Sequence, residues 1–234
     1  MILDVREVHT YHGTSHILFG VSLDVSEGET VCLLGRNGAG KSTTLRSIMG
    51  LTPPAAGSVK FNGVELTGKP PYTIAKLGIG FVPDDRGIFA DLTVQENLEI
   101  AETRRRGNTD AWTLGRLYEA FPMLQGLRAR RGEHLSGGEQ RLLSVARALL
   151  THPRLLIFDE PAEGLSPLVV RAVRDWILRL KQSGMAMLLS EQNVKFALEV
   201  SDRAYVIDKG VIRHHGTVEE LKSNEEIRKR YLMV

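Results

Sequence analysis

The segment from residue 35 to residue 43 constrains the fold of this chain more than any other, because it contains the pattern G-x-x-x-x-G-K-[ST]. The segment before it, Thr30 to Leu34, is mostly apolar and predicts a buried strand. After it, apolar residues at helical spacing predict a helix that closes at Gly50. A strand, a glycine-rich loop and a helix in this order can cradle a phosphate, whereas a glycine-rich turn without a ligand needs neither flank.

Each part of this loop has an expected task. Its glycines allow tight turns that aim successive N–H groups inward, where the positive end of the helix adds to the attraction for a polyphosphate. Lys41 should reach the β- and γ-phosphates of a nucleotide, and the Ser42 hydroxyl should ligate Mg²⁺. The predicted nucleotide-binding residues of the loop are Gly35, Arg36, Asn37, Gly38, Ala39, Gly40, Lys41, Ser42 and Thr43.

Composition narrows the class of protein. A chain of 234 residues, with 42% hydrophobic and 25% charged residues, fits one large globular domain with a sizeable core. No apolar run approaches the roughly 18 residues of a spanning helix, and the first residues lack the order of a signal peptide, so we expect a cytosolic protein. A net charge of +2 is too small to indicate nucleic acid as a partner. The single cysteine, Cys32, excludes a disulfide framework.

Short apolar segments in the N-terminal third predict antiparallel strands. Residues 2–8 and 21–25 are such segments, and residues 11–14 between them are predicted as a turn-rich stretch. Residues 59–66 predict a hairpin with Asn62-Gly63 at or near its turn. This third of the chain should therefore combine antiparallel strands with one strand–helix unit.

Helical patterns follow in the middle of the chain. Thr93 and Glu96 form a capping box for a helix through about Arg105, and a second helical stripe ends before Pro122. Residues 93–131 should therefore form a helical insertion.

The C-terminal part predicts a closing hairpin and a last helix. Residues 203–208 and 211–214 should pair across a Lys-Gly turn. Thr217 and Glu220 should cap a polar C-terminal helix.

Two further segments place polar groups at the start of a helix and at the end of a strand. Ser136 to Gln140 opens a helix with two adjacent glycines, although glycine costs roughly 1 kcal/mol against alanine in a helix interior. Taken alone, Ser136 and Glu139 predict only a capping box. The bare N–H groups beside the two glycines predict a second anion-binding helix end. Residues 155–160 predict a buried strand that ends in Asp159 and Glu160, where a carboxylate downstream of a phosphate loop is expected to coordinate Mg²⁺.

In this order and at this spacing, the phosphate loop, the Ser-Gly-Gly-Glu-Gln segment and the strand ending in Asp159-Glu160 resemble the ATP-binding subunits of ABC transporters. The resemblance covers essentially the whole chain. Residues 82–89, 161–167 and 190–193 are more specifically similar to the ATPase subunit of the branched-chain (hydrophobic) amino-acid importers, including their urea and amide relatives.

The resemblance implies an α/β fold of the ABC ATPase type, with a P-loop NTPase (RecA-like) core, an antiparallel β subdomain and a helical subdomain. It implies a single ABC ATP-binding domain over residues 1–234. The helical subdomain insertion is placed at about residues 93–131 and a C-terminal helical tail at about residues 217–234.

The resemblance also implies residue roles, with ATP and Mg²⁺ as the bound groups. Tyr11 would stack on adenine, and Asp159 and Ser42 would lie in the Mg²⁺ shell. Glu160 would polarise the attacking water. The residues of the Ser-Gly-Gly-Glu-Gln segment would contact the γ-phosphate of ATP held by a partner subunit; they are Ser136, Gly137, Gly138 and Gln140.

Three positions differ from most of the superfamily. Asp84 stands where most members have glutamine, and its carboxylate could serve Mg²⁺; the alternative is an acid of a turn. Gln192 stands where most have histidine, and it can donate its amide to the γ-phosphate or orient water, although it cannot carry a proton; the alternative is a solvated loop residue. Ser166, predicted to cap the next helix with Pro167, replaces the usual aspartate. Tyr11 has the alternative of an ordinary packed aromatic residue.

The expected function is that of an ATP-hydrolysing subunit that energises an ABC importer from the cytoplasmic face of the inner membrane. The implied partners are integral-membrane permease subunits, a second ABC ATPase subunit in a homodimer or heterodimer and, indirectly, a solute-binding protein, with no nucleic acid. The alternatives are a lipopolysaccharide-export ATPase, a soluble ABC ATPase acting on DNA or ribosomes, and a phosphate-loop kinase. A phosphate-loop kinase would leave residues 136–140 unexplained. Soluble ABC ATPases usually have two ATPase units or a long coiled-coil insert, whereas this sequence has one unit and no sustained heptads.

Overall fold

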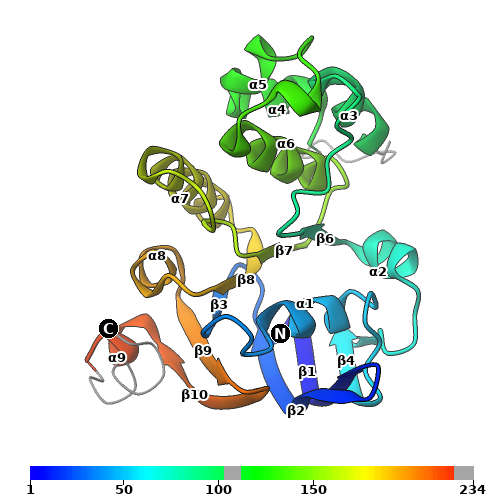
Figure 1. Ribbon diagram of the computed structural model, residues 1–234, viewed down its shortest axis with the longest axis vertical. Helices are drawn as coiled ribbons and strands as arrows, with labels where there is room; N and C mark the ends of the chain where they lie inside the picture. The colour runs from blue at the N-terminus through cyan, green and yellow to red at the C-terminus, as the bar shows by residue number, and fades with distance from the viewer. Residues whose placement is uncertain (103–111, 224–234) are drawn as a thin grey trace.

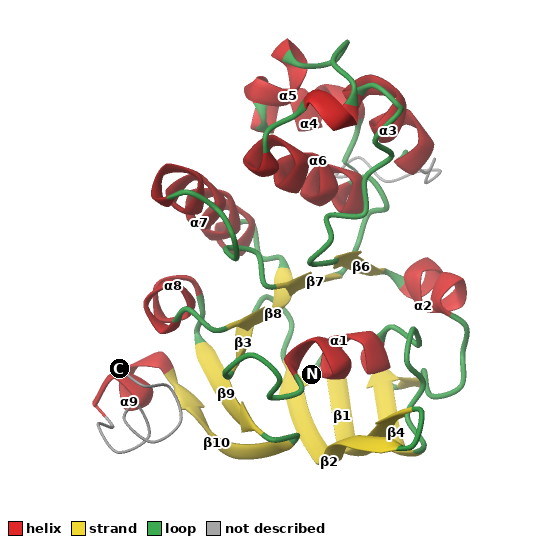
Figure 2. Ribbon diagram, viewed as in Figure 1, coloured by secondary structure: helices red, strands yellow, loops and turns green. Residues whose placement is uncertain are grey.

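The computed structural model describes residues 1–102 and 112–223, which form two β-sheets and a group of helices (Figure 1). Figure 2 shows the sheets in the lower part of the view and several helices gathered above them. The strands are β1 (Leu3–His12), β2 (Ser15–Val25), β3 (Thr30–Leu34), β4 (Ala56–Phe61), β5 (Val64–Glu65), β6 (Ile79–Val82), β7 (Leu155–Asp159), β8 (Ala186–Glu191), β9 (Arg203–Asp208) and β10 (Val211–Thr217). The helices are α1 (Lys41–Ile48), α2 (Pro71–Leu77), α3 (Val94–Ala101), α4 (Leu114–Ala120), α5 (Pro122–Gly126), α6 (Gly137–Leu149), α7 (Pro167–Gln182), α8 (Val194–Val200) and α9 (Val218–Ser223), with a 3₁₀ turn at Gly132–His134.

The central sheet has the order β10-β9-β3-β8-β7-β6. Strands β9, β3, β8, β7 and β6 are parallel, and β10 is antiparallel to β9. Because parallel neighbours end at the same edge of a sheet, the loops that follow β3, β6, β7 and β8 emerge together. Those loops carry, respectively, the predicted phosphate-binding residues, Asp84, Glu160 and Gln192.

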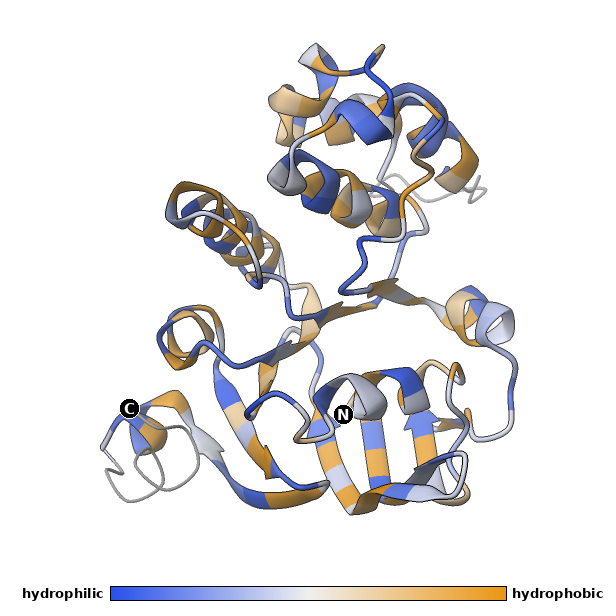
Figure 3. Cartoon of the chain, viewed as in Figure 1, coloured by the Kyte–Doolittle hydropathy of each residue, from blue (hydrophilic) through white to orange (hydrophobic). Residues whose placement is uncertain are grey.

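The second sheet has the order β2-β1-β4-β5 and is antiparallel. Hydrophilic and hydrophobic residues alternate along β1 and β2 in Figure 3, as expected for strands with one covered face. The predicted turn is confirmed at Asn62-Gly63, where both residues have positive φ and β4 pairs with β5. The turn predicted for residues 11–14 is wrong in extent, because Tyr11 and His12 continue β1 and pair with β2, which leaves Gly13 and Thr14 as the turn.

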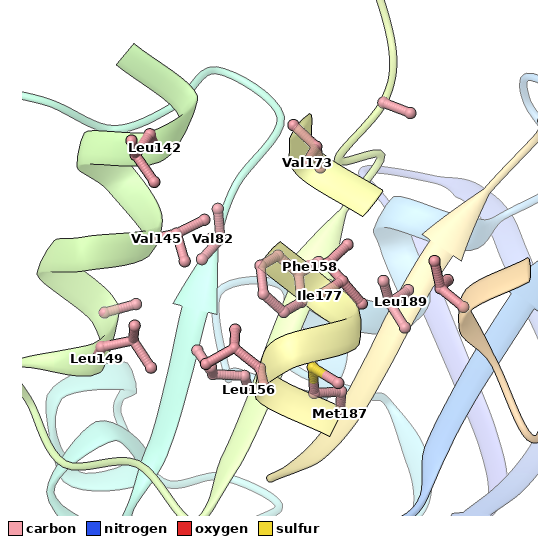
Figure 4. Packing of buried hydrophobic residues seen from close by; sticks show 14 of the residues in the cluster. Val82, Leu142, Val145, Leu149, Leu156, Phe158, Val173, Ile177, Met187 and Leu189 are labelled. Atoms are coloured by element: carbon pink, nitrogen blue, oxygen red, sulfur yellow. The ribbon is translucent and has the colours of Figure 1, made fainter. Parts of the chain in front are cut away.

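Two hydrophobic clusters lie on the two faces of the central sheet. Alternation along β7 sends Leu155 and Ile157 toward the antiparallel sheet, and Leu156 and Phe158 toward the helices. Both faces of the parallel strands are therefore covered, which explains why their sequences are continuously apolar. Figure 4 shows the second cluster, where side chains of β6, β7 and β8 meet those of α6 and α7; its labelled residues are Val82, Leu142, Val145, Leu149, Leu156, Phe158, Val173, Ile177, Met187 and Leu189.

The described residues between β6 and β7 are mostly helical and form the upper lobe in Figure 1. The capping box of Thr93 and Glu96 is present at the start of α3. The predicted extent of this helix is wrong, because Glu102 has extended backbone and α3 ends at Ala101; the predicted end at Arg105 lies outside the described residues.

The remaining predicted helix starts differ in detail. Thr217 and Glu220 exchange capping hydrogen bonds at the start of α9, and the predicted tail beyond Ser223 lies outside the described residues. The predicted start of α7 is confirmed, with Ser166 at the cap position and Pro167 at the first helical position. The Ser166 side chain makes no capping hydrogen bond, so Pro167 is the residue that favours the helix start. The predicted pairing of β9 with β10 across a Lys-Gly turn is confirmed. None of the helices in the two described ranges is both long and apolar enough to cross a membrane.

Candidate functional site

The phosphate loop connects β3 to α1 and is closely packed from behind. A Cβ atom added at Gly35 would lie 2.5 Å from the carbonyl oxygen of Ile207 on β9, so a larger residue does not fit. Gly40 has a φ of 108° and would place a Cβ 2.9 Å from Leu18. It is also the cap residue of α1, which has no side-chain cap and no acidic residue in its first turn. The start of α1 therefore keeps backbone N–H groups available for an anion.

Lys41 is buried and its ammonium group is folded back onto the loop. Its Nζ donates to the carbonyl oxygens of Gly35 at 2.9 Å and Arg36 at 3.0 Å. The same Nζ lies 3.0 Å from Oε1 of Glu160. The lysine is thus held at the mouth of the loop by three oxygen atoms that a phosphate could replace.

Asp159 ends β7 beside the loop and is fully buried. Its Oδ1 accepts hydrogen bonds from the Ser42 hydroxyl at 3.0 Å and the Ser190 hydroxyl at 2.6 Å. Within the described part of the chain, its Oδ2 is buried without a hydrogen-bond partner. Burial raises the pKa of this carboxyl group above its usual value. A buried carboxylate oxygen without a partner, next to a serine hydroxyl, fits a hard divalent cation such as Mg²⁺.

Glu160 follows directly and has left-handed backbone, with a φ of 47°. Its N–H lies within hydrogen-bonding distance of the carbonyl oxygen of Ser190 at 3.2 Å and the Ser190 hydroxyl at 3.0 Å. Burial opposes ionisation of the Glu160 side chain, but hydrogen bonds with Glu163 and Lys41 outweigh it and lower the pKa. The structure therefore holds Glu160 as a carboxylate, the form that can accept a proton.

Two carboxyl groups beside Glu160 were missed by the sequence reasoning. The hydrogen bond to Glu160 is the largest influence on Glu163 and raises its pKa to about 7. Burial raises the pKa of Glu191 to about 7, although its carboxylate accepts the N–H groups of Ala162 at 3.0 Å and Asn193 at 3.3 Å. The position of Glu191 at the end of β8 could have identified it from the sequence, because Asp159 ends the neighbouring strand β7 in the same way.

The loop after β6 places Asp84 close to the site but aims its side chain elsewhere. Its carboxylate is half-exposed, with Oδ1 3.5 Å from Nη2 of Arg46 and 3.0 Å from the N–H of Asp85. Asp159, by contrast, is held by Ser42 and Ser190. The structure therefore shows Asp84 in an ion pair with α1 and does not bring it into the Ser42–Asp159 contact.

Gln192 and Tyr11 are both exposed. Gln192 follows Glu191, whose carbonyl oxygen accepts the N–H of Gly35 at 3.1 Å, so it lies beside the start of the loop. The Tyr11 ring is stacked on His16, with ring centroids 4.2 Å apart, and remains 42% exposed. It is neither free on both faces nor packed in the core.

The segment from Ser136 to Gln140 starts α6 in the upper lobe, apart from α1 in Figure 1. The capping box of Ser136 and Glu139 is present. A Cβ added at Gly138 would lie 2.4 Å from Val169, so this glycine permits close packing on α7. Gln140 accepts a hydrogen bond from Arg86 at 2.5 Å and donates to the carbonyl oxygen of Gly132 at 2.9 Å. Its side chain is therefore used within the chain.

Known proteins are similar to this chain in sequence and in fold. The sequence pattern of the family described as ABC transporter matches residues 18–163. The branched-chain amino acid transport ATP-binding protein BraG of Pseudomonas aeruginosa is 39% identical over 231 residues, with 99% of each chain covered. The lipopolysaccharide export ATP-binding protein LptB of Escherichia coli is 37% identical, covering 91% of this chain and 89% of its own. A dimeric ATP-binding cassette bound to ADP and Pi has a TM-score of 0.80 and 25% identity, covering 93% of this chain and 99% of that one.

Proposed function

The chain belongs to the ABC transporter family of ATP-binding proteins and is an ATPase of that family, and from this premise we propose that it energises an importer of branched-chain amino acids or related solutes. The observation that carries the ATPase chemistry is the meeting of Lys41, Ser42, Asp159 and Glu160 at one edge of the central sheet. These four residues supply a phosphate-binding cation, a hydroxyl, a cation-binding carboxylate and an ionised base. We assign them to a single ABC ATP-binding domain that spans residues 1–234.

ATP binding begins when phosphate oxygens replace the protein oxygen atoms that surround Nζ of Lys41. The β- and γ-phosphates take the place of the carbonyl oxygens and of Glu160 around its Nζ, and the N–H groups of the loop surround the phosphates. Glu160, released from Lys41, is then free to accept the proton of the attacking water. Tyr11 offers its open face to the adenine ring, and Gln192 offers its amide to the γ-phosphate.

Ser42 and Asp159 are the residues that would hold Mg²⁺, since the unpartnered Oδ2 of Asp159 is an available ligand. When bound, Mg²⁺ neutralises charge on the β- and γ-phosphates. Asp84 would enter this shell only after leaving Arg46.

A second ATPase subunit completes the proposed site. Ser136, Gly137 and Gly138 lie at the start of α6, away from the phosphate loop of their own subunit, and a dimer would supply ATP to this helix end from the facing subunit. The dimeric relative bound to ADP and Pi supports this arrangement. The engagement of Gln140 with Arg86 and Gly132 makes it a support for this segment and not a direct ligand.

The proposed partners are integral-membrane permease subunits that bind the ATPase dimer at the cytoplasmic face of the membrane, with a solute-binding protein acting on their other side. The similarity to BraG supports amino acids as the cargo. Export of lipopolysaccharide is the second candidate, supported by the similarity to LptB.

The test is transport by the assembled system. Vesicles that contain the co-expressed permeases and ATPase subunits, with the solute-binding protein on the opposite side, should accumulate labelled leucine when ATP is supplied on the cytoplasmic side, and the Glu160→Gln variant should not. Phosphate release without any acceptor separates this ATPase from a kinase. ATP-dependent extraction of lipopolysaccharide with no leucine uptake would replace the importer by the exporter.

A further inference from the structure

Arg141 is a buried arginine of α6 that links the helix to the edge of the central sheet. Only 3% of its surface is exposed. Its Nη1 donates to the carbonyl oxygen of Pro83 at 2.6 Å, and its Nη2 to those of Asp84 at 3.3 Å and Glu160 at 3.2 Å. Among the described residues, these three hydrogen bonds all go to the backbone and none to a carboxylate.

Burial of the charged Arg141 side chain is energetically unfavourable if it serves packing alone. Burial is the main reason that the pKa of Arg141 is lowered, and its Nε has no hydrogen-bond partner within the described residues. A buried cation that lacks a carboxylate partner is costly in desolvation free energy. The planar guanidinium group, however, can bind several carbonyl oxygens at once in a fixed geometry, which a lysine cannot do.

Of the three hydrogen bonds of Arg141, the one to the Glu160 carbonyl oxygen involves a residue proposed to act in ATP hydrolysis. Left-handed backbone at a residue other than glycine is uncommon and persists only where its surroundings hold it. Ser190 holds the N–H side of Glu160, and Arg141 holds the carbonyl side. These two contacts together fix the backbone from which the Glu160 carboxylate is aimed.

We propose that Arg141 is a positioning residue for ATP hydrolysis, which ties the helix that begins at Ser136 to the backbone of Glu160. This inference rests on the proposed role of Glu160 as the base. α6 begins at the segment proposed to face the partner's ATP and carries Arg141, so one side chain connects that segment to the backbone of Glu160.

The same helix supplies a matched control. Arg147 is half-buried, donates to the carbonyl oxygen of Gly87 and lies over the ring of Phe89 at 4.5 Å. It therefore ties α6 to the same loop after β6 as Arg141 does. The hydrogen bonds of Arg147 do not include the Glu160 carbonyl, so the two arginines differ in the contact under test.

The experiment compares Arg141→Met with Arg147→Met in the full chain, assembled with its partner subunits. Misplaced catalytic groups typically lower rates by up to about a hundredfold, so we expect Arg141→Met to lower kcat by about ten- to a hundredfold with KM for ATP changed less than about twofold. Arg147→Met should leave both within about twofold. Arg141→Lys, which keeps the charge, should give an intermediate kcat and carries the test if the methionine variant does not fold.

Glu160→Gln separates this inference from the function on which it rests. In that background, Arg141→Met should cause no further loss of the residual rate, because the group that it positions is gone. An equal loss of kcat in Arg141→Met and Arg147→Met, or the same proportional loss in the Glu160→Gln background, would overturn the positioning role. If the folded Arg141 variants have normal kcat while Glu160→Gln is inactive, the positioning role of Arg141 is overturned and the role of Glu160 as the base stands. If Glu160→Gln is active, both roles are overturned.

Discussion

Lys41 and Glu160 form a buried ion pair, with Nζ and Oε1 3.0 Å apart and side chains only 3% and 8% exposed. The pair joins the phosphate loop after β3 to the end of β7. Burying both charges costs desolvation free energy that their attraction offsets only while they stay paired, so each residue needs an oppositely charged partner at this position. Neither residue can perform its proposed task while paired, and binding of ATP must therefore separate them.

Replacing Lys41 with alanine should weaken ATP binding about ten- to a hundredfold, because a charge-assisted contact of roughly 1.5 to 3 kcal/mol is lost. Isothermal calorimetry of the isolated chain measures this change, with circular dichroism to verify folding. A folded Lys41→Ala variant with the affinity of the wild type would argue against the phosphate-loop assignment.

Glu160→Gln should lower the hydrolysis rate by about 10² to 10⁴, because the proton acceptor is removed while shape is retained. ATP binding should survive, and the closed dimer should accumulate. Light scattering with ATP, alone and with a candidate partner ATPase, reports the dimer, while phosphate release reports turnover. Near-normal turnover would remove Glu160 as the base. Lost turnover without an ATP-dependent dimer in either mixture would leave the base in place and discard the shared site.

Gln192→Ala should lower the hydrolysis rate while leaving ADP affinity nearly unchanged, because ADP lacks the γ-phosphate that the amide is proposed to contact. Gln192→His is the control and should be tolerated, since its ring can donate a similar hydrogen bond. Equal rates in the wild type and in the alanine variant would show that this exposed residue is a bystander.

Glu191→Gln should change the pH dependence of stability. The pKa of Glu191 is raised from 4.5 to about 7 in the folded protein, mainly by burial. The folded state therefore binds more protons than the unfolded state between these values, and stability falls as pH rises through this window. The variant removes this loss, so its stability relative to wild type should be greater at pH 8 than at pH 5 in urea unfolding. The same difference at both pH values would contradict a raised pKa.

Local patterns predicted the elements whose cause is local. The capping boxes at Thr93 and Ser136 and the turn at Asn62-Gly63 depend on residues a few positions apart, so the sequence contains all that is needed. The end of α3 and the length of β1 were misjudged, because the extent of an element depends on what it pairs with or packs against.

The sequence by itself determined the phosphate loop and the buried strand ending in Asp159 and Glu160, since glycine spacing and apolar runs are properties of the chain alone. Tertiary structure decided which groups meet. Strand order places β8 between β3 and β7, and the shared edge joins Lys41 to Glu160. The contact of Arg141 with the Glu160 carbonyl arises in the same way, because packing of α6 beside the sheet brings together residues whose separation along the chain carries no signal.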